Sequence, residues 1–279
     1  MGDFTTSDGI RLVYDDAVIG APAGGPVILC LAGLTRSALD FEYLLPHLHG
    51  ARVIRLDYRG RGRSGWAPPE TYSIPVETRD VIELLDHLGL NKVAVIGTSR
   101  GGIIAMTLAA TAKDRLAGVC LNDIGPELDP AGIDKIRGYV GVAPAYATLA
   151  EAAEGWGKGM EALGFEGVPA ARWAEEVGHH FRETPDGLSL AYDPGLAQIF
   201  RVATAAPAPD LWPLFDAMAG LPLALIRGAV SDILSEETAA EMGKRRPDMV
   251  FRDVPGRGHI PFLDETEALT AIAEWRALL

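Results

Sequence analysis

Short apolar runs that alternate with helical patterns constrain the fold of this 279-residue chain more than any other feature. Residues 52–57, 92–96 and 116–121 are predicted strands, and the last two are continuously apolar. Amphipathic or Ala-rich helical patterns separate them at residues 77–88 and 101–112. Continuous apolar strands between helices are typical of a parallel sheet that is covered on both faces. The sequence therefore predicts an α/β fold with a mostly parallel central sheet.

The alternation stops at about residue 126 and resumes at residue 221. Between these points the patterns are mostly helical and are interrupted by Pro and Gly. Two further strands precede the alternation, at residues 11–14 and 26–31. After the insertion, strands are predicted at residues 221–227 and 249–254, and helices at residues 236–242 and 265–279. We therefore expect a core of residues 1–125 and 221–279, interrupted by a helical cap of residues 126–220.

Composition excludes several classes of partner. The chain has 38 Asp and Glu against 25 Lys and Arg, which gives a formal net charge of −13. Nucleic acids and anionic membrane surfaces attract clustered basic residues, so neither is an expected partner. The hydrophobic fraction of 48% is enough for a real core and argues against disorder. A small-molecule substrate is the partner that remains, and the oligomeric state is left open.

Cysteine usage and the N-terminus indicate a cytoplasmic protein. Cys30 and Cys120 lie inside apolar runs, as expected for buried thiols of a reducing compartment rather than for a disulfide framework. The first residues form neither a basic nor an apolar region of a signal peptide. No apolar run reaches the length of a membrane-spanning helix.

The strongest chemical signal is the sequence Gly-Thr-Ser-Arg-Gly at residues 97–101. It follows a predicted strand and begins a predicted helix, which is the context of a G-x-S-x-G nucleophile elbow. The serine there occupies a sharp turn, and side chains at Gly97 and Gly101 would collide with it. The pattern predicts Ser99 as the nucleophile.

A serine hydroxyl needs a base, and His259 is the best of six histidines. It lies in a Gly-rich loop after a predicted strand and before the last helix, whereas the others fall on predicted helices or in the insertion. The base in turn needs an orienting carboxylate. Asp232, in the loop after residues 221–227, is favoured. Asp123, at the end of strand 116–121, is the alternative, and its other possible role is to hold the strand end.

Two backbone N–H groups are expected to stabilise the oxyanion. Leu34 follows the strand at residues 26–31, and Arg100 follows the nucleophile. The side chains of Arg36 and Arg100 have two possible roles. They could enter the pocket and hold a substrate carboxylate, or they could pair with acidic residues away from it. The second role is favoured.

These pieces together resemble the α/β-hydrolase fold superfamily over essentially the whole chain. The matching segments are the elbow, the loop Asp-Tyr-Arg-Gly-Arg-Gly-Arg-Ser at residues 57–64, the loop that ends at Asp232, and Gly258-His259. The resemblance implies a cap inserted after the sixth strand and the chain order serine, acid, histidine. Two positions depart from the family pattern: Ala32 stands where a histidine is usual, and Arg100 where Met, Gln or Leu is frequent.

The predicted activity is hydrolysis of a small ester or lactone through an acyl-enzyme. The alternatives are hydrolysis of a carbon–carbon bond in a diketone and, less favoured, a non-catalytic ligand-binding homologue. No cofactor is expected, because no helix can begin cleanly after the G-x-G-x-x-G string at residues 60–65. No metal is expected either, since the H-E-x-x-H and C-x-x-C motifs are absent from the sequence.

Overall fold

The computed structural model describes residues 1–20 and 24–279, and in them eight strands form one sheet in the order β1-β2-β4-β3-β5-β6-β9-β10. The strands are β1 (Gly2–Thr5), β2 (Arg11–Val18), β3 (Val27–Leu31), β4 (Arg52–Asp57), β5 (Val93–Thr98), β6 (Leu116–Asn122), β9 (Leu223–Gly228) and β10 (Val250–Val254). The strand β2 pairs antiparallel with β1 and β4, and the other neighbours pair in parallel. The predicted mostly parallel sheet is confirmed.

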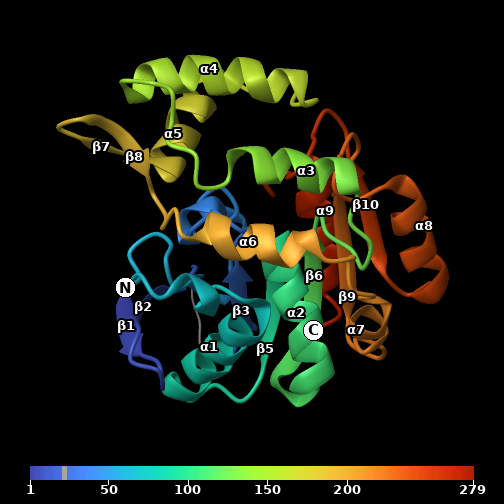
Figure 1. Ribbon diagram of the computed structural model, residues 1–279. Coiled ribbons are helices and arrows are strands. Elements are labelled where there is room, and N and C mark those ends of the chain that lie inside the picture. The colour runs from blue at the N-terminus through green and yellow to red at the C-terminus, as the bar shows by residue number, and fades with distance from the viewer. Residues whose placement is uncertain (21–23) are drawn as a thin grey trace.

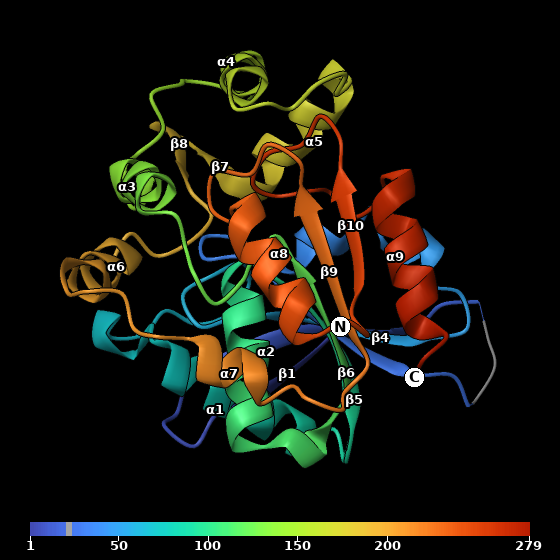
Figure 2. The same cartoon turned by 90° about the vertical axis from the view of Figure 1, so that its right-hand side faces the viewer.

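Helices cover both faces of this sheet (Figure 2). One face packs against α1 (Ile74–His87), α2 (Arg100–Thr111), α7 (Trp212–Asp216) and α8 (Glu236–Arg245). The other face packs against α9 (Thr266–Arg276) and the short 3-10 helices Ala38–Phe41 and Leu45–His47. Every residue of β5 is buried, which explains its continuous apolar run.

The parallel strands β3, β5, β6 and β9 end at one edge of the sheet, and the loops that follow them meet there. In open α/β sheets, ligands bind in the crevice outside the carboxyl ends of the strands. The fold therefore brings together the loops that begin at Ala32, Ser99, Asp123 and Ala229.

Elements of residues 130–205 lie above this edge, and we refer to them together as the cap (Figure 1). It contains α3 (Pro130–Tyr139), α4 (Leu149–Ala162), α5 (Ala170–His180) and α6 (Leu196–Ala205). It also contains a β-hairpin that the sequence analysis missed, formed by β7 (Phe181–Thr184) and β8 (Gly187–Leu190). The hairpin turns through Pro185-Asp186, and Gly187 has a φ of 113°, which favours glycine.

The helix α7 belongs to the layer that covers the sheet, although it lies within the segment predicted as the cap. It packs against α2, and Phe215 is fully buried in the same apolar cluster as α1 and α2. The part of the insertion that lies above the sheet edge therefore ends before Trp212. No helix in the described ranges is long and apolar enough to cross a membrane.

Candidate active site

Ser99 occupies a sharp turn between β5 and α2. Its φ of 48° and ψ of −113° lie outside the conformations of ordinary strands and helices. A Cβ atom at Gly97 would lie 2.6 Å from the carbonyl oxygen of Gly101, and one at Gly101 would lie 2.0 Å from that of Leu31. Both positions thus require glycine, because the elbow packs backbone against backbone. The predicted strand–turn–helix context is present.

His259 faces Ser99 from the loop between β10 and α9. Its Nε2 lies 3.0 Å from Ser99 Oγ, which is hydrogen-bonding distance. Both side chains line the same cavity. The structure thus brings together the predicted nucleophile and the predicted base, which are 160 residues apart in the sequence.

Asp123, rather than Asp232, contacts the other nitrogen of His259. Asp123 Oδ2 lies 2.6 Å from His259 Nδ1. The carboxylate is completely buried, and it also accepts hydrogen bonds from the Gly228 N–H at 2.8 Å and the Ser231 hydroxyl at 2.6 Å. Asp123 follows β6 directly and has a φ of 53°, a left-handed turn that Asp tolerates better than most residues.

The preference for Asp232 as the partner of His259 is therefore wrong. The Asp232 carboxylate lies 2.8 Å from Lys135 Nζ, and its side chain is 33% exposed. The loop after β9 does reach the site, but Ser231 makes the contact by donating its hydroxyl to Asp123. The chain turns at this point, and Asp232 faces α3 of the cap instead of the histidine.

Two backbone N–H groups near Ser99 are free to bind an oxyanion. Among the described residues, the N–H groups of Leu34 and Arg100 donate no hydrogen bond. Arg100 is the first residue of α2, where the helix itself supplies no acceptor for the N–H. The helix dipole adds partial positive charge at this end. The loop of Leu34 follows β3, which neighbours β5 in the sheet.

The two candidate substrate-binding arginines are both engaged with carboxylates. Arg100 Nε lies 2.6 Å from Glu77 Oε2, so its side chain pairs away from Ser99, in agreement with the favoured role. Arg36 is not on the surface, since it lines the cavity. It donates to Asp40 at 2.7 Å and to Glu176 of α5 at 2.7 Å. Two carboxylates thus neutralise Arg36.

Burial shapes the charges around Arg36. Burial raises the pKa of Asp40 to about 6, although Arg36 opposes this shift. Burial and the neighbouring Arg36 both lower the pKa of His180, whose Nε2 contacts Arg36 Nη1. His180 is therefore neutral at pH 7. This cluster joins the loop of Leu34 to the cap through α5.

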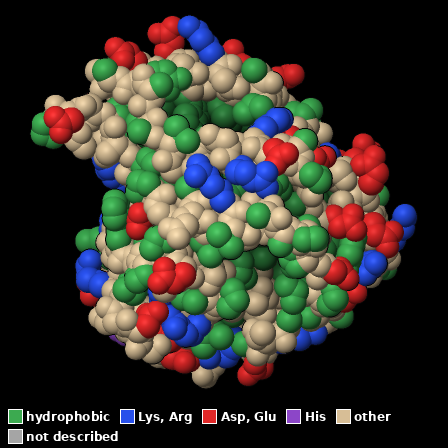
Figure 3. Space-filling view, viewed as in Figure 1, with side chains coloured by type: hydrophobic (Ala, Val, Ile, Leu, Met, Phe, Trp, Pro, Cys, Tyr) green, Lys and Arg blue, Asp and Glu red, His purple; other side chains and the backbone are tan. Residues whose placement is uncertain are grey.

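A cavity of about 580 Å³ opens between Ser99 and the cap. Its lining is mainly apolar and includes Tyr139, Trp156, Met160 and Phe165 of the cap. Figure 3 shows hydrophobic side chains gathered in the hollow beneath α4. Helical spacing in the sequence does not distinguish aromatic side chains that line a pocket from those that only pack. In residues 1–20 and 24–279, no group of three or more His, Cys, Asp or Glu residues could hold a metal ion.

The chain belongs to the alpha/beta hydrolase fold family, whose model matches residues 26–266. It is thus a hydrolase of the α/β fold, as the resemblance implied. A 3-hydroxybutyrate-oligomer hydrolase from Cupriavidus necator is 35% identical over 280 residues, which cover 94% of this chain and 91% of that protein. A crystal structure of an alpha/beta hydrolase from Novosphingobium aromaticivorans is 38% identical with a TM-score of 0.92, covering 100% of this chain and 98% of that one.

A more distant relative acts on a different kind of molecule. The 2-(acetamidomethylene)succinate hydrolase of Mesorhizobium japonicum is 26% identical over 238 residues, covering 84% of this chain and 82% of that protein. The fold is therefore shared by hydrolases with different substrates, and the site itself has to indicate the reaction.

Proposed function

We propose that the protein is a serine hydrolase that cleaves a small carboxylic ester. The observation that carries this proposal is the hydrogen-bonded series Ser99 Oγ, His259 Nε2, His259 Nδ1 and Asp123 Oδ2, with distances of 3.0 and 2.6 Å. Ser99 and His259 line an apolar cavity that is large enough for a small organic molecule. The same groups in the same order activate a serine in acyl transfer.

In the first half of the reaction, Ser99 Oγ attacks the ester carbonyl while His259 Nε2 takes its proton. The buried Asp123 accepts from Nδ1–H, so that Nε2 presents its lone pair to the serine. The N–H groups of Leu34 and Arg100 bind the carbonyl oxygen as it becomes an oxyanion. The C–O bond to the leaving group then breaks, and His259 gives the proton to the departing alcohol.

The second half repeats this chemistry with water. His259 removes a proton from water as the water oxygen attacks the acyl-enzyme. The bond to Ser99 Oγ breaks, the proton returns to that oxygen, and a carboxylic acid is released. The N–H groups of Leu34 and Arg100 serve the second oxyanion as they serve the first.

The lining of the cavity favours an uncharged acyl group of modest size. Arg36 is neutralised by Asp40 and Glu176, so a carboxylate on the substrate would meet two negative charges beside one positive charge. An oligomer of 3-hydroxybutyrate, the compound named for the relative from Cupriavidus necator, contains a series of short aliphatic ester links. We propose uncharged esters of short hydroxyacids as the substrate class, with lactones as the cyclic variant.

The test is hydrolysis of chromogenic esters of graded acyl length and of 3-hydroxybutyrate dimers and trimers whose terminal carboxyl group is methylated. We expect turnover of neutral short esters by the wild type and a slower reaction with half-esters that carry a carboxylate near the scissile bond. Ser99→Ala should reduce kcat by about 10⁴-fold or more and abolish labelling by a fluorophosphonate probe. The circular dichroism spectrum should stay unchanged, since the hydroxyl is not part of the packing. Substantial residual turnover in Ser99→Ala would remove the serine from its proposed role.

A further inference from the structure

A fully buried carboxylate, that of Glu77, is connected to the proposed oxyanion site through two arginines. Glu77 of α1 is 0% exposed, and its two oxygens bind two different arginines. Glu77 Oε1 accepts from Arg61 Nη1 at 2.6 Å, and Glu77 Oε2 accepts from Arg100 Nε at 2.6 Å. Burial by itself would raise the pKa of Glu77, but Arg100 and Arg61 outweigh it and lower this pKa. The carboxylate is thus ionised at pH 7.

Each of the two arginines is linked to one of the proposed oxyanion donors, Arg61 by a hydrogen bond and Arg100 because its own N–H is the donor. Arg61 Nε donates to the carbonyl oxygen of Leu34 at 2.9 Å. Arg100 is itself the second donor, and its Nη2 also binds the carbonyl oxygen of Tyr72 at 2.9 Å. The guanidinium of Arg61 is buried and lies over the rings of Tyr58 and Tyr72 at 5.6 and 5.5 Å.

The two donor amides lie on separate loops, after β3 and after β5, and no hydrogen bond in the described ranges joins them directly. An oxyanion hole works only when both donors lie about 2.7–3.1 Å from the oxygen that becomes charged. The series Leu34, Arg61, Glu77 and Arg100 is a continuous polar connection between them. It also leaves one net positive charge, from two arginines and one glutamate, close to where negative charge develops.

We propose that Glu77 is a positioning residue, which sets the spacing of the Leu34 and Arg100 amides through the two arginines. This inference rests on the proposed serine hydrolase function. It assigns to α1, which does not line the cavity, an influence on stabilisation of the transition state that acts through the two arginines. It also explains why arginine at position 100, beside the nucleophile, points away from the substrate.

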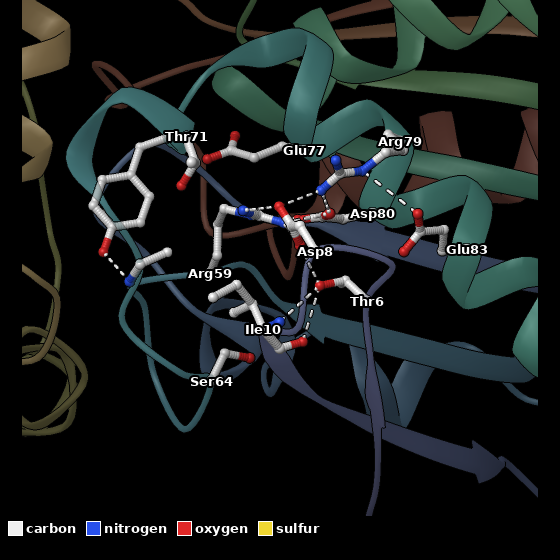
Figure 4. Close-up of polar contacts among 12 residues, drawn as sticks. Thr6, Asp8, Ile10, Arg59, Ser64, Thr71, Glu77, Arg79, Asp80 and Glu83 are labelled. Atoms are coloured by element: carbon white, nitrogen blue, oxygen red, sulfur yellow. Dashed lines mark hydrogen bonds and ion pairs between the residues drawn. The ribbon is translucent and has the colours of Figure 1, made fainter.

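The same helix offers a matched control. Asp80 lies one turn after Glu77 on α1, is 1% exposed, and binds Arg59 with distances of 2.6 and 2.7 Å. Figure 4 shows this pair, with Asp80 and Asp8 facing Arg59. Asp80 contacts neither Leu34 nor Arg100. Neutralising Asp80 therefore removes a comparable buried charge, although the carbonyl oxygen of Arg59, not its side chain, accepts a hydrogen bond from Arg61 Nη1.

The experiment compares Glu77→Gln with Asp80→Asn on a short neutral ester. Each variant is also measured for binding of a trifluoromethyl ketone, whose tetrahedral serine adduct places an oxyanion in the hole, and of the product carboxylic acid. For Glu77→Gln we expect kcat to fall about 10- to 100-fold and ketone affinity to fall in parallel. KM and product affinity should stay within about twofold, because the ground state uses these amides little. Asp80→Asn should lower Tm but keep kcat.

Equal kcat for folded Glu77→Gln and wild type, or equal losses in both variants, would overturn the proposal. If Glu77→Gln does not fold, Arg61→Lys decides the question. It keeps the charge that faces Glu77 but lacks the fork that also reaches the Leu34 carbonyl, so the same loss of kcat and ketone affinity is expected. Ser99→Ala distinguishes a failure of the proposed function from a failure of the positioning role alone. Turnover that survives in Ser99→Ala contradicts the proposed function, whereas turnover that is lost there but intact in Glu77→Gln contradicts only the positioning role.

Discussion

Asp123 receives hydrogen bonds from three residues. The donors are the His259 ring, the Gly228 N–H and the Ser231 hydroxyl, each within 2.8 Å. Two of these contacts come from the end of β9 and from the loop that follows it, and they hold the carboxylate while it orients the histidine. A buried carboxylate without such partners would be expensive to keep ionised. The residue therefore combines a structural role at the end of β6 with its proposed role in the triad.

Exchanging each of the two aspartates for asparagine tests this assignment at the residue scale. Asp123→Asn should lower kcat by roughly 10³- to 10⁴-fold, because the amide favours the wrong tautomer of His259. Asp232→Asn should leave kcat within about twofold, since it removes only a half-exposed ion pair with Lys135. Steady-state kinetics on one ester, with thermal unfolding as the folding control, compares the two. A large loss in Asp232→Asn with an active Asp123→Asn would reverse the assignment.

At the scale of elements, the junction of β5 and α2 is the tightest part of the site. The helix begins so close to the sheet that the Gly101 position meets the backbone of Leu31 on β3. Strands β3 and β5 and the N-terminus of α2 thus meet at this junction. The proposed oxyanion donors come from the same junction, one on each of two adjacent loops.

Two glycine-to-alanine changes in helices should have opposite effects on stability. A Cβ at Gly101 would lie 2.0 Å from a backbone oxygen, so Gly101→Ala should lower the free energy of unfolding by about 3 kcal/mol or more and displace Ser99. At Gly243 of α8 a Cβ would meet nothing within 4 Å. Gly243→Ala should therefore stabilise by about 0.4–1 kcal/mol. Urea unfolding measures both, and comparable stability of the two variants would contradict the close approach.

The cap is joined to the core by charged side chains as well as by apolar packing. Arg36, on the loop after β3, binds Glu176 of α5, and Lys135 of α3 binds Asp232 on the loop after β9. The first pair is mostly buried and the second is half-exposed, so the first contributes more to fixing the position of the cap. Both pairs border the cavity, and cap position and cavity shape are therefore linked.

At the scale of the whole molecule, the two cysteines report on the integrity of the sheet. Cys30 of β3 and Cys120 of β6 are free, fully buried thiols in the apolar layer beneath α9. Burial raises the pKa of Cys30 to about 12 and raises that of Cys120 as well. Because the thiolate is the reactive form, the folded protein should protect both residues.

We expect neither thiol to react with a disulfide reagent at pH 8 in the native state, and both to react in denaturant. In the unfolded chain the thiol pKa is about 8.5. The folded state therefore holds these protons to higher pH, so this contribution to stability is present below about pH 8.5 and declines as the pH rises toward 12. The labelling rate should follow global unfolding measured by circular dichroism. Rapid labelling under native conditions would show that the sheet opens locally.

Much of this protein is encoded in local patterns of the sequence. The apolar runs predicted the parallel strands, because strands that are buried on both faces need no polar positions. The G-x-S-x-G string and the Gly-rich loop of His259 predicted residues that the structure brings within hydrogen-bonding distance. These signals are visible because the turn at Ser99 restricts its immediate neighbours in the chain. The hairpin of β7 and β8, by contrast, is short and half-exposed. Its strands show no clear pattern in the sequence, and only Gly187 indicates a turn.

The sequence by itself determined the order of strands and helices in the core and the residues at the sharp elbow, where geometry depends on adjacent residues. Only the tertiary structure decided between Asp123 and Asp232, because both follow strands that end at the same edge of the sheet. It alone showed that Arg100 and Arg36 form ion pairs with carboxylates of α1 and α5. Such pairings depend on how distant elements pack, and in the sequence an arginine that is free for a substrate looks the same as one that is already paired.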